Sequence, residues 1–166
     1  CGLRQHHKLL DIGCGSLRLG RLLIPYLNTE NYIGVEPNQW LVDDGIRNEL
    51  GSSLVEQRKP KFVIAEGLEP LASDMQFDYA IAQSIFSHTA PDLLERWIRD
   101  VSLGLSEHGV LLATVLEGEI ECKGNGWIYP ECVEYCLDTV ATFARKYDLG
   151  FQILNWYHPR QTWCAF

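Results

Sequence analysis

Hydrophobic and polar positions along the chain form two kinds of segment. Short runs rich in apolar and β-branched residues predict strands at 8–12, 31–36, 61–65, 77–82, 109–116, 151–156 and 161–166. Longer segments with apolar residues at helical spacing predict helices at about 16–27, 38–50, 91–105 and 130–147. Strands that are joined through helices are typical of a parallel sheet, so the pattern predicts an α/β fold.

Proline marks two of the predicted helices. Pro91 stands in the first turn of the helix over 91–105, where a missing amide hydrogen costs nothing. That helix has an apolar stripe made of Leu93, Leu94, Trp97, Ile98, Val101 and Leu105. Pro25 should kink or end the first helix near Ile24, because it removes a hydrogen bond and crowds the preceding turn.

The last two predicted strands are separated only by the residues YHPR. This connection is too short for a crossover, so the two strands must pair antiparallel as a hairpin. The chain contains no repeat, low-complexity tract or linker, and we expect residues 1–166 to form a single domain. The first predicted strand begins at residue 8, so we expect no helix ahead of it in residues 1–7.

Composition narrows the functional classes. A chain of 166 residues that is 46% hydrophobic can bury one sizeable core. The net charge of −8 and the lack of a Lys/Arg block argue against nucleic acid as a partner. The first residues lack a signal-peptide pattern, and no run of 18 apolar residues occurs, so we expect a soluble cytoplasmic protein without a membrane partner.

The six cysteines are expected to be reduced, because a domain with a full apolar core has little need of disulfides. No Cys-x-x-Cys spacing is present. A zinc site made of Cys132 and Cys136 with Cys122 or His158 would be improvised, with no complete zinc motif behind it, so no metal is predicted.

The turn after the first strand reads Gly13-Cys14-Gly15-Ser16. Gly13 and Gly15 allow the backbone to approach a ligand, and Ser16 could cap the following helix. A phosphate-binding P-loop would end in Gly-Lys-Ser/Thr, and a dinucleotide fingerprint would need a glycine where Leu17 and Arg18 stand. Both of these interpretations fail on spacing, whereas a purely structural strand-to-helix turn stays open.

Two acids accompany the glycine turn. Glu36 ends the strand YIGVE, at the position where a carboxylate can accept hydrogen bonds from both hydroxyls of a ribose. The alternative for Glu36 is a solvated residue at a strand end. Asp11 precedes the glycines, at a position that is usually apolar in nicotinamide-binding folds.

These segments together resemble class I S-adenosylmethionine-dependent methyltransferases. The matching segments are LLDIGCGS (9–16), YIGVEPN (32–38), FDYAIAQSIFSHT (77–89) and LSEHGVLLATV (105–115), in the order and spacing of the family. The resemblance implies a Rossmann-like three-layer sandwich with a seven-stranded, mostly parallel sheet that ends in an antiparallel C-terminal hairpin. Members of the family often have helices before the first strand, and we expect this chain to lack them, whether they are truncated, disordered or supplied by another chain.

The resemblance implies that the cofactor is S-adenosyl-L-methionine and that S-adenosyl-L-homocysteine is the product. Asp11 would hold the amino group of the cofactor or the loop, the glycine turn and Gln83 would meet the methionine portion, Glu36 would bind the ribose, and Glu66–Leu68 would meet adenine. The implied cofactor-binding set is Asp11, Gly13, Cys14, Gly15, Glu36, Pro37, Glu66, Gly67, Leu68 and Gln83. Leu17 departs from the family, which often has a third glycine there.

Methyl transfer needs a base only if the acceptor loses a proton, and His88, which follows the fourth strand, is the candidate. A capping or packing role for His88 is the alternative. Candidate acceptor contacts are Arg18, Trp127, Tyr129, Tyr135 and His158, although the aromatic residues could equally pack the loop down and Arg18 could be a solvated helix residue.

The sequence therefore predicts methyl transfer to an O, N or C nucleophile of a small molecule by in-line displacement. The segment AQSI after the fourth strand lacks the Asn/Asp-Pro-Pro-aromatic motif of enzymes that methylate nucleic acid bases. No pair of carboxylates suggests metal-assisted catechol methylation. Two alternatives remain open: a catalytically silent binding or scaffold module, and a nicotinamide-dependent oxidoreductase.

Overall fold

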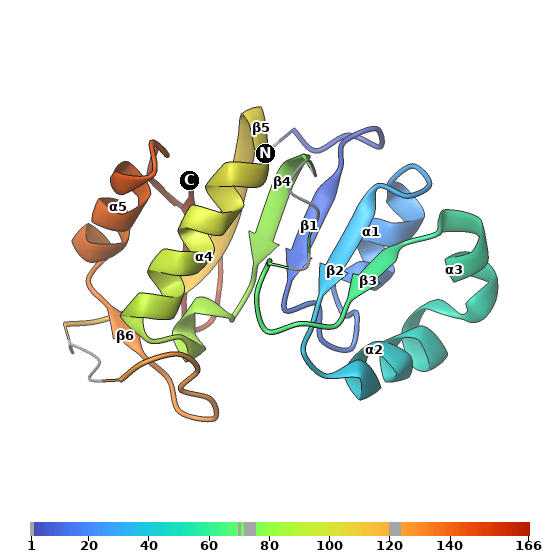
Figure 1. The fold of residues 1–166 in the computed structure, drawn as a ribbon, viewed down its shortest axis with the longest axis horizontal. Coiled ribbons are helices and arrows are strands. Elements are labelled where there is room, and N and C mark those ends of the chain that lie inside the picture. Colours follow the sequence, from blue (N-terminus) through green and yellow to red (C-terminus); the bar gives the residue numbers. More distant parts are fainter. Residues whose placement is uncertain (1, 70, 72–75, 120–123) are drawn as a thin grey trace. The chain divides into compact units, whose positions relative to one another are not determined.

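The computed structural model describes residues 2–69, 71, 76–119 and 124–166. Its internal contacts divide the chain into two compact units. The first unit contains Cys1–Ile81 and Leu105–Gly109, and the second contains Ala82–Gly104 and Val110–Phe166 (Figure 1).

The first unit is built on parallel strands in the order β3-β2-β1-β4. These strands are β1 (Leu9–Ile12), β2 (Tyr32–Val35), β3 (Lys61–Val63) and β4 (Phe77–Ala82). The register pairs Leu9 with Tyr32 and Asp11 with Gly34. Because parallel strands end at the same edge, the residues that follow β1, β2 and β3 lie along one edge of this sheet.

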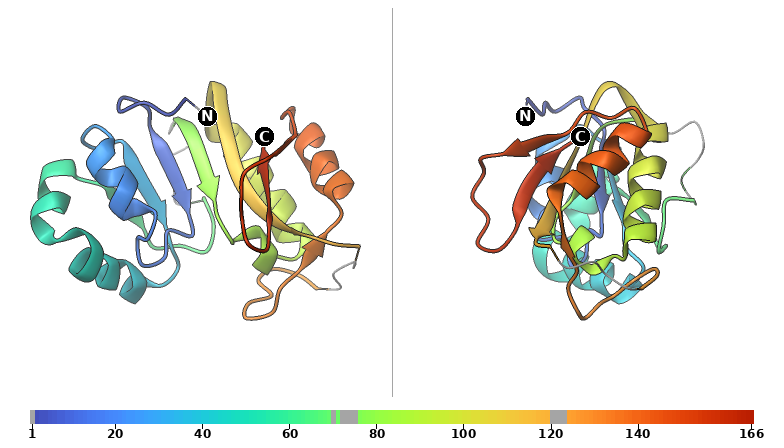
Figure 2. Two further views of the ribbon diagram at one scale, coloured as in Figure 1. Left: turned by 180° about the vertical axis from the view of Figure 1, so that it is seen from behind. Right: turned by 90° about the vertical axis from the view of Figure 1, so that its left-hand side faces the viewer.

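The helices of the first unit are shorter than expected. They are α1 (Gly20–Tyr26), α2 (Gln39–Gly45) with the π-helical turn η1 (Ile46–Leu50), and α3 (Ser52–Arg58). Figures 1 and 2 show α1 against one face of β1 and β2. The pattern did not predict α3, and the predicted helix at 38–50 is divided between α2 and η1.

The start of α1 corrects one expectation and its end confirms another. Ser16 does not cap α1, because the helix begins at Gly20 and its N-cap residue is Leu19. The helix ends at Tyr26, directly after Pro25, because Leu27 turns into an extended conformation with ψ 154°. Pro25 therefore lies in the final turn of α1.

The second unit contains the hairpin that was predicted at the C-terminal end. Its elements are η2 (Phe86–His88), α4 (Pro91–Gly104), β5 (Leu105–Glu117), β6 (Glu134–Tyr135), α5 (Leu137–Lys146), β7 (Gln152–Leu154) and β8 (Thr162–Ala165), with β5 beginning in the first unit. Strand β8 pairs antiparallel with both β5 and β7, and β6 runs parallel to the end of β5.

The predicted helix over 130–147 begins only at Leu137. Residues 134–135 pair with β5 instead, and the amide of Val133 donates a hydrogen bond to the carbonyl of Ser87 (2.7 Å). The helix predicted from apolar spacing was therefore too long at its start, because these tertiary hydrogen bonds hold the first predicted turn in an extended conformation.

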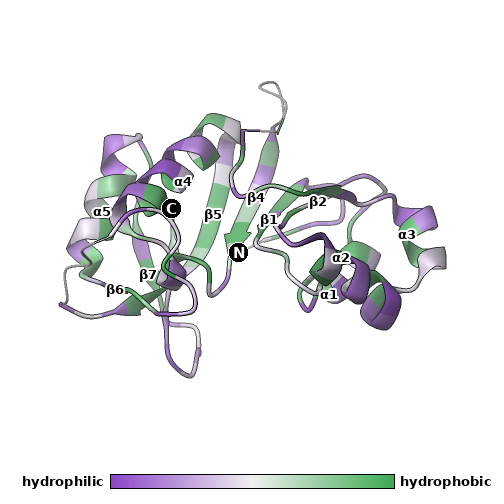
Figure 3. Ribbon diagram, turned by 60° about the horizontal axis from the view of Figure 1, so that its bottom comes forward, coloured by the Kyte–Doolittle hydropathy of each residue, from purple (hydrophilic) through white to green (hydrophobic). Residues whose placement is uncertain are grey.

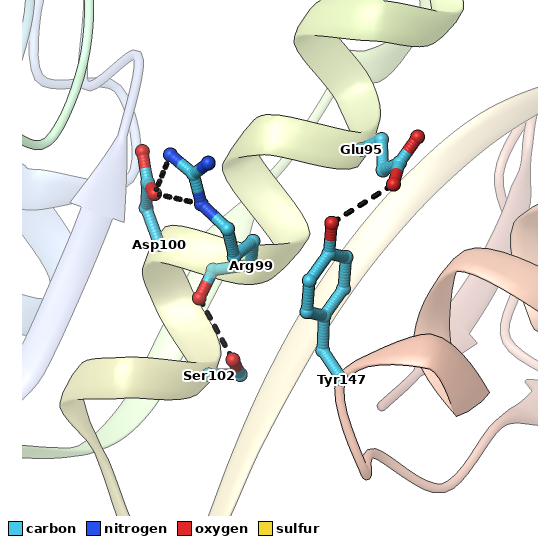
Figure 4. Close-up of polar contacts among 5 residues, drawn as sticks. All are labelled: Glu95, Arg99, Asp100, Ser102 and Tyr147. Atoms are coloured by element: carbon cyan, nitrogen blue, oxygen red, sulfur yellow. Dashed lines mark hydrogen bonds and ion pairs between the residues drawn. The ribbon is translucent and has the colours of Figure 1, made fainter.

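Helices α4 and α5 pack side by side against β5 (Figures 1 and 2). Trp97 and Ile98 bury the inner face of α4, while Figure 3 shows hydrophilic residues along the rest of the helix. Glu95 accepts a hydrogen bond from the hydroxyl of Tyr147 at 2.8 Å (Figure 4). It also accepts one from Lys146, and the two contacts tie α4 to the end of α5.

A small apolar cluster lies beneath the glycine turn of the first unit. Leu17, Cys14 and Val42 are buried in it. Leu17 is fully buried although its φ is +61°, in the left-handed region that a branched side chain rarely adopts. This strained leucine occupies the position where the family often has a glycine, so the turn keeps a glycine-like backbone and gains an apolar anchor.

We expect Gly45→Ala to destabilise the protein and disturb the glycine turn. A Cβ at Gly45 would lie 2.6 Å from the carbonyl oxygen of Ser16 and 2.7 Å from Cγ of Leu17. Overpacking of this kind costs roughly 1–3 kcal/mol in free energy of unfolding. Chemical denaturation measures it, and Gly150→Ala is the matched control because a Cβ there meets nothing within 4 Å. Equal stability of both variants would contradict the expectation.

Candidate functional site

The glycine turn is held against the end of β2 by its own backbone. The amides of Gly13 and Cys14 both donate to the carbonyl of Val35, at 2.8 and 3.1 Å. Gly13 and Gly15 have φ of +67° and +52°, which glycine adopts without strain. The side chain of Cys14 points away from the edge into the core, since a Cβ on Gly34 would lie 2.8 Å from its sulfur. Cys14 therefore offers only backbone to a ligand.

Glu36 connects the turn after β1 with the turn after β2. Its Oε2 accepts the amide of Gly15 at 3.1 Å. Its Oε1 accepts both the amide and the side-chain Nδ2 of Asn38, each at 3.0 Å. Glu36 is only 5% exposed, so this is a buried carboxylate that organises two loops.

Asp11 is the second buried acid at this edge, with 4% exposure. Its Oδ2 accepts a hydrogen bond of 2.5 Å from the hydroxyl of Tyr32. Burial is the largest effect on the pKa of the Asp11 carboxyl; it is opposed by the hydrogen bond from Tyr32 and assisted by the negative charge of Glu36, and together these effects raise the pKa to about 7. Burial together with the two acids also raises the pKa of the Cys14 thiol, which stays protonated at neutral pH.

Neither acid has a cationic partner in the described part of the chain. The ion pairs there join Arg21 to Glu49, Arg99 to Asp100 and Lys146 to Glu95, all at the surface. Buried carboxylates are normally paired, because an unpaired buried charge is costly. Two buried acids that accept hydrogen bonds but have no cation among the described residues therefore form, beside the glycine turn, a site suited to a cationic ligand.

The other residues predicted for this edge are placed as follows. Pro37 is exposed directly after Glu36, and Arg18 is exposed after the turn. Glu66, which follows β3, is exposed, whereas Gly67 and Leu68 are buried. The structure thus brings Asp11, Gly13, Gly15 and Glu36 together by hydrogen bonds and strand register, and places Glu66–Leu68 after the neighbouring strand.

In the second unit, Gln83 is exposed in the turn that follows β4. The next residue, Ser84, has φ +58°, and its amide donates to the hydroxyl of Thr114 on β5 at 2.7 Å. This contact fixes the path of the chain from β4 into η2, where His88 lies.

His88 is half-buried at the end of η2. Its Nδ1 lies 2.8 Å from the carbonyl oxygen of Glu131. A carbonyl can only accept, so Nδ1 carries the hydrogen and the lone pair of the neutral ring is on Nε2. The ring of Tyr129 lies edge-on to His88, with centroids 5.3 Å apart.

The loop from Gly126 to Val133 is fastened to the segment that carries His88. The amide of Ile128 donates to the carbonyl of His88 at 2.8 Å, and the amide of Ala90 donates to the carbonyl of Gly126 at 2.8 Å. The carboxylate of Asp92 accepts the amide of Gly126 at 3.0 Å. The loop and the histidine are therefore held as one assembly.

The aromatic candidates divide into packed and exposed residues. Tyr135 is buried, with its hydroxyl 2.5 Å from the carbonyl of Thr89, and Trp127 packs edge-on against Trp97. Tyr129 is 74% exposed beside His88. Trp127 and Tyr135 thus support the loop, and Tyr129 is the one of these three available for contact.

His158 has the opposite tautomer to His88. Its Nδ1 accepts the amide of Gln161 at 2.9 Å and that of Arg160 at 3.2 Å, so the hydrogen of the neutral ring is on Nε2. Nε2 of Gln161 in turn donates to the hydroxyl of Ser87 at 3.1 Å, next to His88. His158 can donate a hydrogen bond where His88 can accept one.

Sequence reasoning missed three groups: Tyr32, Asn38 and the carbonyl of Glu131. Asn38 had a signal, because an amide two residues after a buried acid can bond to it. A tyrosine in an otherwise apolar strand was also a signal, since a buried hydroxyl needs a partner. The carbonyl of Glu131 had none.

The described residues contain no metal-binding cluster, no disulfide and no membrane-spanning helix. No three His, Cys, Asp or Glu side chains gather there as a metal site, and Cys122 lies outside the described ranges. Cys14, Cys132, Cys136 and Cys164 are free thiols. No helix of this part of the chain has both the length and the apolar character needed to cross a bilayer.

No protein-family model matches the chain. Its fold does match solved structures. Magnesium protoporphyrin IX methyltransferase from Synechocystis PCC 6803, crystallised with bound SAM, matches 99% of this chain and 70% of its own at 14% identity and a TM-score of 0.71. A ribosomal protein L11 methylase from Lactobacillus delbrueckii subsp. bulgaricus matches 99% of this chain and 71% of its own at 15% identity and 0.66. The cyclase SpnF matches 93% of this chain and 55% of its own at 20% identity and 0.67.

These likenesses, with the mixed and mostly parallel sheet, show a Rossmann-like fold of the class I S-adenosylmethionine-dependent methyltransferase type. The predicted α/β class and the antiparallel C-terminal strands are confirmed. The described strands number eight rather than seven, because β6 adds a short strand beside β5.

We expect Asp11→Asn to change how stability depends on pH. Because the pKa of Asp11 is raised from 3.8 to about 7, the folded protein binds a proton that the unfolded chain releases between these values. Wild-type stability from this group is complete below pH 4 and is lost as the pH rises through 7, with a slope of at most about 1.4 kcal/mol per pH unit.

Denaturant unfolding at pH 5 and pH 8 measures this effect. The neutral amide of Asp11→Asn should remove the slope, so the variant gains stability relative to the wild type at pH 8. Parallel curves for the two proteins would show that Asp11 does not titrate in this range.

Proposed function

We propose that the protein transfers the methyl group of S-adenosyl-L-methionine to an O, N or C nucleophile of a small molecule. The observation that carries this proposal is the pair of buried acids, Asp11 and Glu36, which lack a cationic partner in the described ranges at the carboxyl ends of β1 and β2. A ligand with a positively charged amino-acid end and a ribose offers a cation to Asp11 and hydroxyl donors to Glu36.

The residues at this edge fit the cofactor chemically. Asp11 would attract the ammonium group, the turn from Gly13 to Gly15 would pass along the methionine portion, and Glu36 would accept ribose hydroxyls. Three donors already fill three of about four acceptor positions on the carboxylate of Glu36. Binding of both hydroxyls therefore requires the side chain of Asn38 to release Oε1. The cofactor itself would supply an electrophilic methyl group.

The structural neighbours support S-adenosylmethionine as the cofactor, but they show that the fold alone does not determine the acceptor or the reaction. One neighbour was crystallised with SAM and is named as a porphyrin methyltransferase, one is named as a methylase of a ribosomal protein, and one as a cyclase. The fold therefore serves acceptors of different classes and a reaction other than methyl transfer. The reaction of this protein therefore has to be inferred from its site residues and tested by detecting a methylated product.

His88 is the base in this proposal. The carbonyl of Glu131 fixes the tautomer of its ring, so the lone pair on Nε2 is available to take a proton from a hydroxyl or amine acceptor. Tyr129 stands exposed beside the ring, and His158 offers an N–H to a polar group of the acceptor. The charge of −8 favours a small molecule over nucleic acid.

Glu36→Ala should weaken binding of S-adenosylhomocysteine at least about tenfold, because it removes charge-assisted hydrogen bonds to the ribose. Isothermal titration calorimetry measures the affinity, and Glu56→Ala on the exposed side of α3 is the matched control. Absence of binding to the wild type would overturn the proposed cofactor, whereas unchanged affinity of Glu36→Ala would overturn only the role of Glu36.

His88→Gln should abolish or strongly reduce turnover, by about a hundredfold or more, while affinity for S-adenosylhomocysteine is retained. Turnover is measured by mass spectrometry of cell extract incubated with enzyme and S-adenosylmethionine that carries a deuterated methyl group. Loss of stability with normal turnover per folded molecule would assign His88 to packing. Cofactor binding without any labelled product would favour the silent binding module.

A further inference from the structure

Tyr32 is a buried residue whose polar atom is committed to the candidate cofactor site. It is the first residue of β2 and is 1% exposed. Its hydroxyl donates to Oδ2 of Asp11 at 2.5 Å. An apolar residue could fill this strand position without a hydrogen-bond partner, whereas a buried phenol needs one. The hydroxyl is therefore the feature that distinguishes tyrosine from an apolar residue here.

Close contacts with neighbouring residues fix the position of the Tyr32 side chain. Gly20, the first residue of α1, has no side chain, and a Cβ there would lie 3.0 Å from the phenol oxygen. The ring packs edge-on against Phe62 on β3, with centroids 6.2 Å apart. Contacts from α1 and β3 thus hold the phenol so that its hydroxyl reaches from β2 to Asp11 on the neighbouring strand β1.

Besides Tyr32, no ionisable group that faces Asp11 in the described part of the chain stabilises its charge. Glu36, after β2, is negative, and the thiol of Cys14 in the glycine turn is an uncharged neighbour. Tyr32 is the described residue that donates a hydrogen bond to the carboxylate, and it leaves Oδ1 without one. The phenol therefore both favours ionisation and selects which oxygen remains available to a ligand.

We propose that Tyr32 is a positioning residue of the cofactor site, which holds the Asp11 carboxylate charged and oriented so that Oδ1 receives the ammonium group of the amino-acid portion of the cofactor. This inference rests on the proposed function. It assigns to Tyr32 a contribution to one part of the ligand, the amino-acid end, and none to the adenosine end.

A pair of ligands tests this assignment. S-adenosylhomocysteine and 5′-methylthioadenosine share adenosine and the thioether, but only the first carries the amino-acid portion. Tyr32→Phe should weaken binding of S-adenosylhomocysteine about fivefold or more at pH 7 and change binding of 5′-methylthioadenosine by no more than about twofold. Calorimetry measures both, and Tyr79→Phe on β4 is the matched control, because its ring lies against His7 and it pairs with Leu9 rather than Asp11.

The pH profile gives a readout that simple loss of packing would not move. In the ligand-free protein, the midpoint of the Asp11 carboxyl titration, followed by carbon-detected NMR, should rise by about one to two pH units in Tyr32→Phe, because a hydrogen bond to the charged form is lost. In an Asp11→Asn background, Tyr32→Phe should cause no further loss of S-adenosylhomocysteine affinity.

The possible outcomes separate this inference from the proposed function. If the wild type binds neither ligand, the proposed function fails and the inference fails with it. If the wild type binds both and Tyr32→Phe weakens both equally, or neither, only the role of Tyr32 is overturned. If Tyr32→Phe does not fold, Tyr32→3-fluorotyrosine, a stronger donor, should lower the Asp11 midpoint, and an unchanged or raised midpoint would overturn the inference.

Discussion

The hydrogen bond from the amide of Gly15 to the carboxylate of Glu36 is the interaction on which the candidate site depends. It joins the loop after β1 to the loop after β2, and it brings a negative charge to an edge that contains a second buried acid, Asp11. The parallel strands make this meeting possible, because they deliver both loops to one edge. The glycine turn can follow the required path only because Gly13 and Gly15 accept positive φ.

This edge is a place where the protein gives up stability. Two carboxyl groups are buried without a cation among the described residues, and one of them is held near its point of neutralisation at physiological pH. Leu17 adds backbone strain directly beside them. Destabilising features of this kind are common at ligand sites, because a ligand that supplies the missing charge stabilises the folded protein on binding.

The sequence predicted the strands of the first unit, the C-terminal hairpin and the position of Glu36, because each follows from local periodicity and from the rule that parallel strands end at one edge. The start of α5 was predicted too early, since the pairing of residues 134–135 with β5 overrides helical spacing. The partner of Asp11 was not foreseen, because it depends on the space left by Gly20, which belongs to another element. The tautomer of His88 likewise depends on a carbonyl 43 residues away.

The hydrogen bonds that fasten the loop from Gly126 to Val133 onto the segment around His88 have a consequence for engineering. Insertions after the fifth parallel strand vary freely in most sheets of this kind, because such loops lie on the surface. Here, a graft that replaced this loop alone would also remove the carbonyl that sets the proton on the imidazole. A graft that keeps the tautomer of His88 must therefore transfer the two segments together.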